Sequence, residues 1–132
     1  MKLQIRLVVL AGILAMALFS AAAVMAAPPS SFSGVWEADD NVDGSHLRLT
    51  VSGGGNGTYR LRWLDDYWSL CSGGPGRGSG TASLSGGTLS GTIAFYCGSS
   101  LVLEAPVTFT LNGDDTMTDS VQGATWSPVG SP

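Results

Sequence analysis

The chain has 132 residues, of which 44% are hydrophobic and only 12% are charged, and its formal net charge is −4. This acidic balance excludes most nucleic-acid-binding proteins, because phosphate contacts need a basic surface. With one histidine and two cysteines, the chain lacks the ligand set of an ordinary zinc site. We expect no cofactor and no enzymatic activity, since His46 stands beside no nucleophile and no nucleophile elbow is present.

Residues 1–26 have the pattern of a secretory signal peptide. Lys2 and Arg6 precede an apolar run over residues 7–19, and small residues lead to a cleavage point after Ala26. An uncleaved membrane anchor is the alternative, because the apolar run is nearly long enough to span a bilayer. We predict a secreted or periplasmic protein without membrane contact after cleavage. A short flexible linker at 27–33 would then lead into one domain at 34–132.

From residue 34 onward, short alternating runs of apolar and polar residues are separated by Gly, Asn and Asp. The runs lie near residues 34–38, 46–51, 59–63, 82–84, 89–97, 101–111, 117–121 and 124–126, and 72–80 is predicted as a glycine-rich loop. None of them has helical periodicity. Eight strands with short connections predict an all-β fold. We expect an antiparallel eight-stranded up-and-down barrel, since closure removes exposed strand edges, with a two-sheet β-sandwich as the alternative.

The alternation also predicts which side chains face inward. An eight-stranded barrel has room for packed side chains or for one small ligand, and the many bulky residues at inward positions favour a filled interior. Asp119 falls on the inward side between Met117 and Val121, so it is either buried with a partner or part of a bulge. The predicted inward set is Trp36, Leu47, Leu49, Val51, Tyr59, Leu61, Trp63, Leu84, Leu89, Ile93, Phe95, Leu101, Leu103, Val107, Phe109, Leu111 and Trp126.

The two cysteines, Cys71 and Cys97, predict a disulfide, because an even cysteine count in an exported chain usually means a bridge. Their separation of 26 residues corresponds to a stabilisation of roughly 3 kcal/mol in the chain-entropy model.

The stretch WLDDYWSLC at residues 63–71 breaks the alternation with two carboxylates and two further aromatic residues. It has two interpretations: a cluster at the barrel rim that caps the core, or a recognition patch, since exposed aromatic residues with polar neighbours are typical interface anchors. The residues of this possible binding patch are Asp65, Asp66, Tyr67, Trp68, Arg77 and Tyr96.

The segment 39–44 matches the first half of a calcium-binding loop. Asp39, Asn41 and Asp43 stand at alternate positions before a glycine. However, the position that requires a bidentate glutamate is Thr50, within a predicted strand, and the same residue types also form hairpin turns. We therefore predict a turn and no metal site, and keep these three residues as a weak calcium candidate.

The first predicted strand resembles the start of calycin-type barrels, the lipocalins and avidins. The similarity rests on Gly34-Val35-Trp36 and on Asp43-Gly44-Ser45 at the following turn. It implies a barrel with a small-ligand cavity. The last predicted strand, 124–127, lacks the basic residue that lipocalins pack against that Trp. The whole pattern also resembles small uncharacterised exported bacterial β-barrel proteins, a group that implies no particular activity.

We expect a non-enzymatic exported barrel, a structural or protein-interaction module, whose partner is an unknown protein or small ligand and not a nucleic acid. A calycin-type small-ligand carrier is one alternative. Another is an inhibitor of a secreted protease, because exported bacterial inhibitors with eight-stranded barrels exist and some use a short N-terminal tail like residues 28–33. We expect a monomer.

Overall fold

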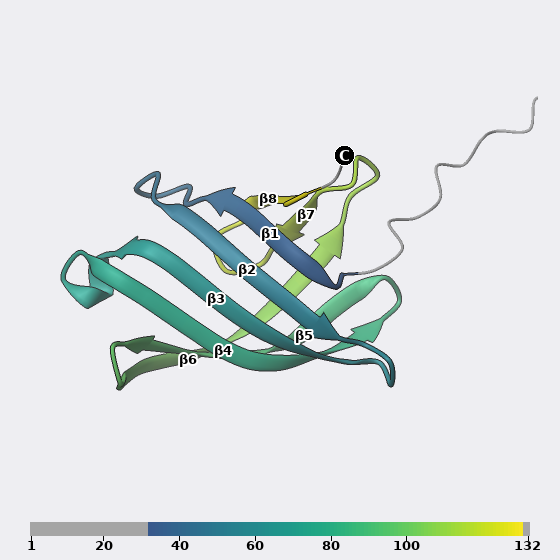
Figure 1. Ribbon diagram of the computed structural model, residues 1–132, viewed down its shortest axis with the longest axis horizontal. Coiled ribbons are helices and arrows are strands. Elements are labelled where there is room, and N and C mark those ends of the chain that lie inside the picture. Colours follow the sequence, from purple (N-terminus) through teal and green to yellow (C-terminus); the bar gives the residue numbers. More distant parts are fainter. Residues whose placement is uncertain (1–31, 131–132) are drawn as a thin grey trace, which may run out of the picture.

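The computed structural model describes residues 32–130 (Figure 1). The predicted signal peptide, most of the predicted linker and the last two residues lie outside this range. The described chain forms eight strands and one 3-10 turn, Ser69–Cys71. The strands are β1 (Gly34–Asp39), β2 (His46–Gly53), β3 (Thr58–Trp68), β4 (Gly74–Ser85), β5 (Thr88–Cys97), β6 (Ser100–Leu111), β7 (Met117–Asp119) and β8 (Thr125–Pro128).

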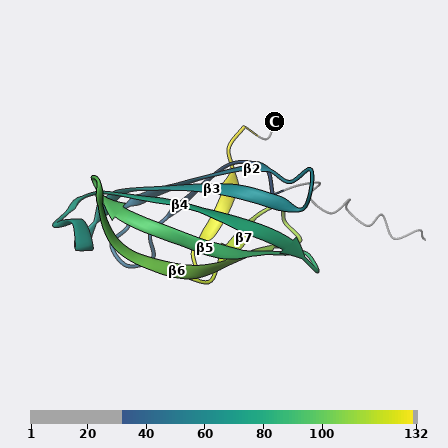
Figure 2. The ribbon, with the colours of Figure 1, turned by 90° about the horizontal axis from the view of Figure 1, so that it is seen from below.

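Each strand pairs antiparallel with the next, and β8 pairs with β1, which closes the barrel. Figure 2 shows the strands from β2 to β6 following one another around the wall. The predicted eight-stranded up-and-down barrel is therefore confirmed, and the sandwich alternative is not observed. Turns that demand positive φ separate the strands, for example at Gly57 and at the pair Gly86 and Gly87.

The interior of the barrel is filled mainly by aromatic and branched aliphatic side chains. Trp63 lies near its centre, edge-on to Trp126 at a ring-centroid distance of 4.7 Å and to Phe95 at 5.8 Å. Most of the predicted inward residues are buried. Met117, which the alternation placed on the inward side, is buried as well. Four further buried hydrophobic residues were not in the predicted set: Phe32, Ala38, Ala82 and Ala124.

Four predicted inward residues are not fully buried. Leu84 is 43% exposed, because it is the penultimate residue of β4, where the β4–β5 hairpin ends. Leu101 is 56% exposed, because a register shift next to Phe95 pairs it with the half-buried Tyr96. Leu103 and Leu111 are partly buried and pack against the core. Val121 also departs from the prediction, since β7 ends at Asp119 and Val121 lies in the following turn.

The prediction of a glycine-rich loop at residues 72–80 is wrong for residues 74–80, which belong to the first part of β4. Gly76 and Gly78 are buried in the barrel wall, beside the large rings of β3. A Cβ atom at Gly76 would lie 2.8 Å from Trp68 Cε3, and one at Gly78 would lie 2.7 Å from Ile93 Cγ2. Glycine is therefore required in this strand for close packing.

The two ends of the barrel differ. At the end where β1 begins and β8 finishes, the buried Phe32 packs edge-on against Tyr59, and Trp36 Nε1 donates a hydrogen bond of 2.9 Å to the Phe32 carbonyl oxygen. We call this the Phe32 end. The other end, here the disulfide end, carries the turns at residues 40–45, 69–73, 98–99 and 120–124.

Candidate functional site

The predicted disulfide between Cys71 and Cys97 is present. Cys71 ends the 3-10 turn that follows β3, and Cys97 ends β5. The start of β4 lies between them, because Gly76 pairs with Cys97. The bond therefore fastens the 3-10 turn to the edge of the wall at the disulfide end.

The barrel wall divides the six residues of the predicted binding patch into separate groups. Asp65 is buried, with 4% of its surface exposed, and it continues the inward alternation of β3 from Trp63. A register shift between Asp65 and Trp68 then leaves Tyr67 exposed and packs the half-buried Trp68 against the core. Asp66 is exposed.

The remaining two patch residues, Arg77 and Tyr96, lie on the outer surface of the wall. They face each other across β4 and β5, and Arg77 also pairs with Leu64 of β3. The structure thus brings Asp65 together with Trp68 at the barrel interior, and Arg77 together with Tyr96 outside it. It does not bring all six residues to one surface.

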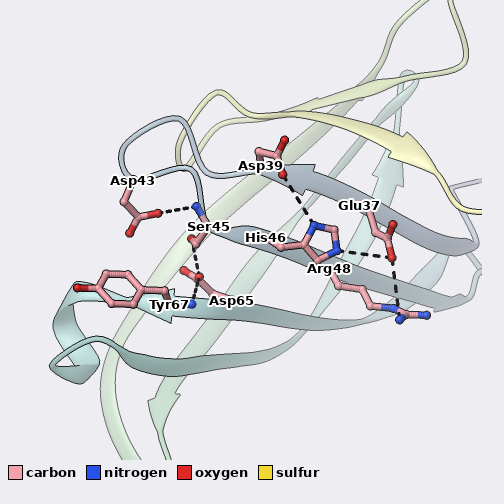
Figure 3. Close-up of polar contacts among 8 residues, drawn as sticks. All are labelled: Glu37, Asp39, Asp43, Ser45, His46, Arg48, Asp65 and Tyr67. Atoms are coloured by element: carbon pink, nitrogen blue, oxygen red, sulfur yellow. Dashed lines mark hydrogen bonds and ion pairs between the residues drawn. The ribbon is translucent and has the colours of Figure 1, made fainter.

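Asp65 is held by two hydrogen bonds to one carboxylate oxygen (Figure 3). Ser45 Oγ donates to Asp65 Oδ1 at 2.9 Å, and the backbone N–H of Tyr67 donates to the same oxygen at 3.0 Å. Burial raises the pKa of Asp65 above its ordinary value, and the nearby carboxylates of Asp40 and Asp43 act in the same direction, while the two hydrogen bonds oppose them.

A small cavity of about 70 Å³ opens beside Asp65 at the disulfide end. Gln122 is one of its lining residues, and the side-chain oxygen of Gln122, Oε1, is buried and has no hydrogen-bond partner among the described residues. The lining consists of Trp63, Asp65, Trp68, Gly76, Phe95, Leu103, Val121 and Gln122. No sequence pattern indicated Gln122, because it lies in a turn with no periodicity.

The outer face of β2, β3 and β4 carries every arginine of the described residues: Arg48, Arg60, Arg62 and Arg77. The sequence has no lysine beyond Lys2, so this face holds all the arginine and lysine charge of residues 32–130. The register places Arg62 beside Thr50 and Ser79, and places Leu64 between Arg48 and Arg77. An open groove over this face is lined by Arg62, Leu64, Arg77, Ser79 and Tyr96, among others.

The three weak calcium candidates point to different partners, and Figure 3 shows two of them, Asp39 and Asp43. Asp39 Oδ1 lies 3.8 Å from His46 Nδ1. Asp43 Oδ1 accepts a 2.9 Å hydrogen bond from the backbone N–H of Ser45, as in an Asx turn. Asn41 Nδ2 donates to the backbone oxygen of Gln122 at 3.3 Å. Among residues 32–130, no group of three or more His, Cys, Asp or Glu side chains is arranged to hold a metal ion.

Asp119 is buried and fully engaged within its own hairpin. Its Oδ1 accepts hydrogen bonds from the backbone N–H groups of Val121 and Gln122, and its Oδ2 accepts from Ala124 N–H and from Trp126 Nε1 at 2.8 Å. The open question about Asp119 is thus answered: it is buried with partners, and it shapes the turn that carries Gln122.

Comparison with protein-family models, with curated proteins and with solved structures finds no match. Within the described part of the chain, no helix has the length and apolar character needed to cross a membrane.

Proposed function

We propose that the protein is an exported, non-enzymatic binding module that docks an acidic protein partner on the outer face of β2, β3 and β4. The observation that carries this proposal is the gathering of Arg48, Arg60, Arg62 and Arg77 on one face of an otherwise acidic chain. Beyond residue 26 these four arginines stand against ten acidic residues, a formal charge of −6. Such a separation steers an acidic partner toward one face.

Three of these arginines are available for a partner. Arg48 Nη1 lies 4.0 Å from Glu37 Oε1, whereas Arg60, Arg62 and Arg77 form no ion pair with any described residue. Arg60 and Arg62 have small hydroxyl residues as cross-strand neighbours, such as Ser79 beside Arg62, which leave their guanidinium groups unobstructed. Arg77 lies between Leu64 and Tyr96. Guanidinium forks recognise carboxylates with two parallel hydrogen bonds.

Apolar side chains beside the arginines favour a protein partner over a simple polyanion. Leu64 and Leu101 are 44% and 56% exposed, and the register joins them in one row through Arg77 and Tyr96. Arginine and tyrosine next to exposed aliphatic residues are the composition of protein interfaces.

The test uses poly-L-glutamate as an acidic polypeptide probe and measures its binding to the mature protein at two salt concentrations. We expect binding that weakens as salt rises. The double variant Arg62→Ala/Arg77→Ala should lower the affinity at least tenfold. The control is the double variant Ser90→Asp/Thr108→Asp, which changes the net charge equally at exposed positions of β5 and β6.

If the two double variants weakened polyglutamate binding equally, the effect would come from net charge alone, and binding at the arginine face would be contradicted. Binding of double-stranded DNA as tightly as polyglutamate would overturn the assignment of an acidic protein partner.

The alternative of a small-ligand carrier is favoured by one specific observation, the cavity beside Asp65. The protease-inhibitor hypothesis depends on the segment before Phe32, nearly all of which lies outside the described residues, so it stays a prediction from sequence.

A further inference from the structure

We propose that the cavity at the disulfide end binds the head group of a primary alkylammonium ion, with Asp65 as its counter-ion. This site is separate from the arginine face, and it would operate whether or not that face binds a protein.

The first argument concerns the charge of Asp65. Its side chain is almost fully buried, and it forms no ion pair with any arginine or histidine among the described residues. Both of its hydrogen bonds reach Oδ1, so Oδ2 has no donor among residues 32–130. Buried carboxylates are normally paired with a cation. Asp40 and Asp43 add further negative charge nearby, which favours a cationic ligand.

The second argument is an unused acceptor on another lining residue, Gln122. Gln122 Oε1 is buried and has no hydrogen-bond partner in the described chain. A buried acceptor without a donor costs free energy. A primary ammonium group has three N–H donors, so it can serve the Asp65 carboxylate and keep donors for a second acceptor such as this amide oxygen, once the Gln122 side chain turns toward the ligand.

Aromatic rings supply the remaining walls. Trp63 and Trp68 each contact Phe95, at ring-centroid distances of 5.8 and 5.6 Å, and all three rings line the cavity. Aromatic faces attract organic cations, and tryptophan does so most strongly. A carboxylate combined with aromatic walls therefore selects a cation over a neutral ligand of the same size.

The volume of the cavity and the need for N–H donors on the ligand restrict the class of ligand. The cavity of about 70 Å³ is less than half of a cavity of ~150 Å³ that holds benzene, so only a few non-hydrogen atoms fit. Tetramethylammonium has no N–H donor and fills more space than ethylammonium. Val121, a lining residue that is 40% exposed, marks where a longer chain would leave the cavity. The ligand is thus a small free amine or the end of a lysine side chain.

The experiment follows the indole N–H signals of Trp63 and Trp68 by NMR while the mature, oxidised protein is titrated. The probes are ethylammonium, tetramethylammonium and ethanol. We expect saturable shifts with ethylammonium alone, with a Kd on the order of millimolar, because so few atoms make contact. Further titrations with n-butylammonium and with Nα-acetyl-lysine methyl amide distinguish a free amine from a lysine side chain: a preference of tenfold or more for one identifies the source.

Three variants test the assigned groups. Asp65→Asn keeps the acceptor for Ser45 and Tyr67 but loses the charge, and it should weaken ethylammonium binding at least tenfold. Gln122→Leu should weaken it by a smaller factor, and the half-buried Gln122 lies in a turn outside the strands, so the barrel should tolerate the change. The matched control, Asp66→Asn, changes the neighbouring exposed carboxylate and should bind as the parent protein does.

The proposal is overturned if ethylammonium produces no saturable shift, if ethanol or tetramethylammonium binds equally well, or if Gln122→Leu and Asp65→Asn both bind like the parent. Should Asp65→Asn fail to fold, the comparison of ethylammonium with ethanol and tetramethylammonium on the parent protein decides the question. The double variant Arg62→Ala/Arg77→Ala should leave these shifts unchanged, so a failure here is distinct from a failure of the acidic-partner proposal.

Discussion

Two buried carboxylates show opposite situations at the scale of single residues. Asp119 accepts four hydrogen bonds, two on each oxygen, whereas Asp65 uses only Oδ1. The first carboxylate is satisfied within its own hairpin, and the second is left open toward a cavity. Asp119 therefore organises its turn, while Asp65 keeps one oxygen available to a ligand in the cavity.

Replacing Asp119 with Asn should destabilise the fold by about 3 kcal/mol, since the amide NH₂ would face N–H donors where Oδ2 now accepts. Urea denaturation followed by tryptophan fluorescence measures this change. Asp115→Asn serves as the control, because Asp115 is exposed and asparagine tolerates its positive φ of 64°. Equal stability of the two variants would show that the hydrogen bonds to Asp119 contribute nothing.

The raised pKa of Asp65 predicts an unusual pH dependence. The folded state holds this proton more tightly than the unfolded chain, whose ordinary value is 3.8. The contribution of Asp65 to the free energy of unfolding should therefore fall as the pH rises from 3.8 to the folded pKa, and stay constant above it. Asp43 and Asp114 have lowered pKa values, so their contributions change in the opposite direction.

Comparing the unfolding free energies of the parent and of Asp65→Asn between pH 3 and 7 isolates the contribution of the Asp65 carboxyl group. We expect the variant to gain stability relative to the parent as the pH rises. A difference that stays constant across the range would contradict a raised pKa of Asp65.

Sequence periodicity predicted these residues only in part. The alternation that places Met117 inside also places Asp119 inside, but its donors come from the turn and from Trp126, which strand periodicity does not reach. Asp65 continues the inward series from Trp63, yet a carboxylate after three apolar residues was interpreted as the end of that series. The burial of Asp65 beside a cavity depends on residues from several strands, so the sequence around Asp65 cannot reveal it.

At the scale of elements, β4 is the strand that departs most from ordinary strand composition. Its glycines meet Trp63, Trp68 and the backbone of β5 at close range. The glycine content of residues 72–80 predicts a loop, because glycine is depleted in strands. The groups that require those glycines lie on two other strands, β3 and β5, so no local pattern in β4 reveals the requirement.

Gly80→Ala should lower the free energy of unfolding by about 1–3 kcal/mol, because the new methyl group would collide with the carbonyl oxygen of Thr92. Urea denaturation measures the loss. Gly113→Ala is the matched control, since a Cβ there meets nothing within 4 Å. If Gly80→Ala left the free energy of unfolding unchanged, β4 and β5 would have to move apart at that point without loss of stability.

At the scale of the whole molecule, the barrel is closed unevenly. The strands β2 to β6 pair through long registers, whereas β1 and β8 share only the pairs Trp36–Pro128 and Glu37–Ser127. Alternation along the chain predicted eight strands but left barrel and sandwich open, because closure depends on the contact of the first strand with the last. That contact has no signal within either segment.

The short β1–β8 seam predicts uneven hydrogen exchange. Amides of β8 and of the β1 edge that faces it should exchange faster than those in the middle of β4, since local opening occurs where few hydrogen bonds and contacts must break. Native-state exchange followed by NMR measures the difference. Uniform exchange across the eight strands would show that the seam opens only when the whole barrel unfolds.

The chain also enters and leaves the barrel at the Phe32 end, where the Val129 N–H donates to the Val35 carbonyl oxygen at 2.8 Å. Because β1 and β8 run antiparallel with both outer ends there, a force that pulls the two termini apart loads their hydrogen bonds one after another, as in unzipping. The barrel is therefore mechanically weak between its own ends. A surface that holds the protein by one terminus alone places no such load on the seam and leaves the disulfide end facing away.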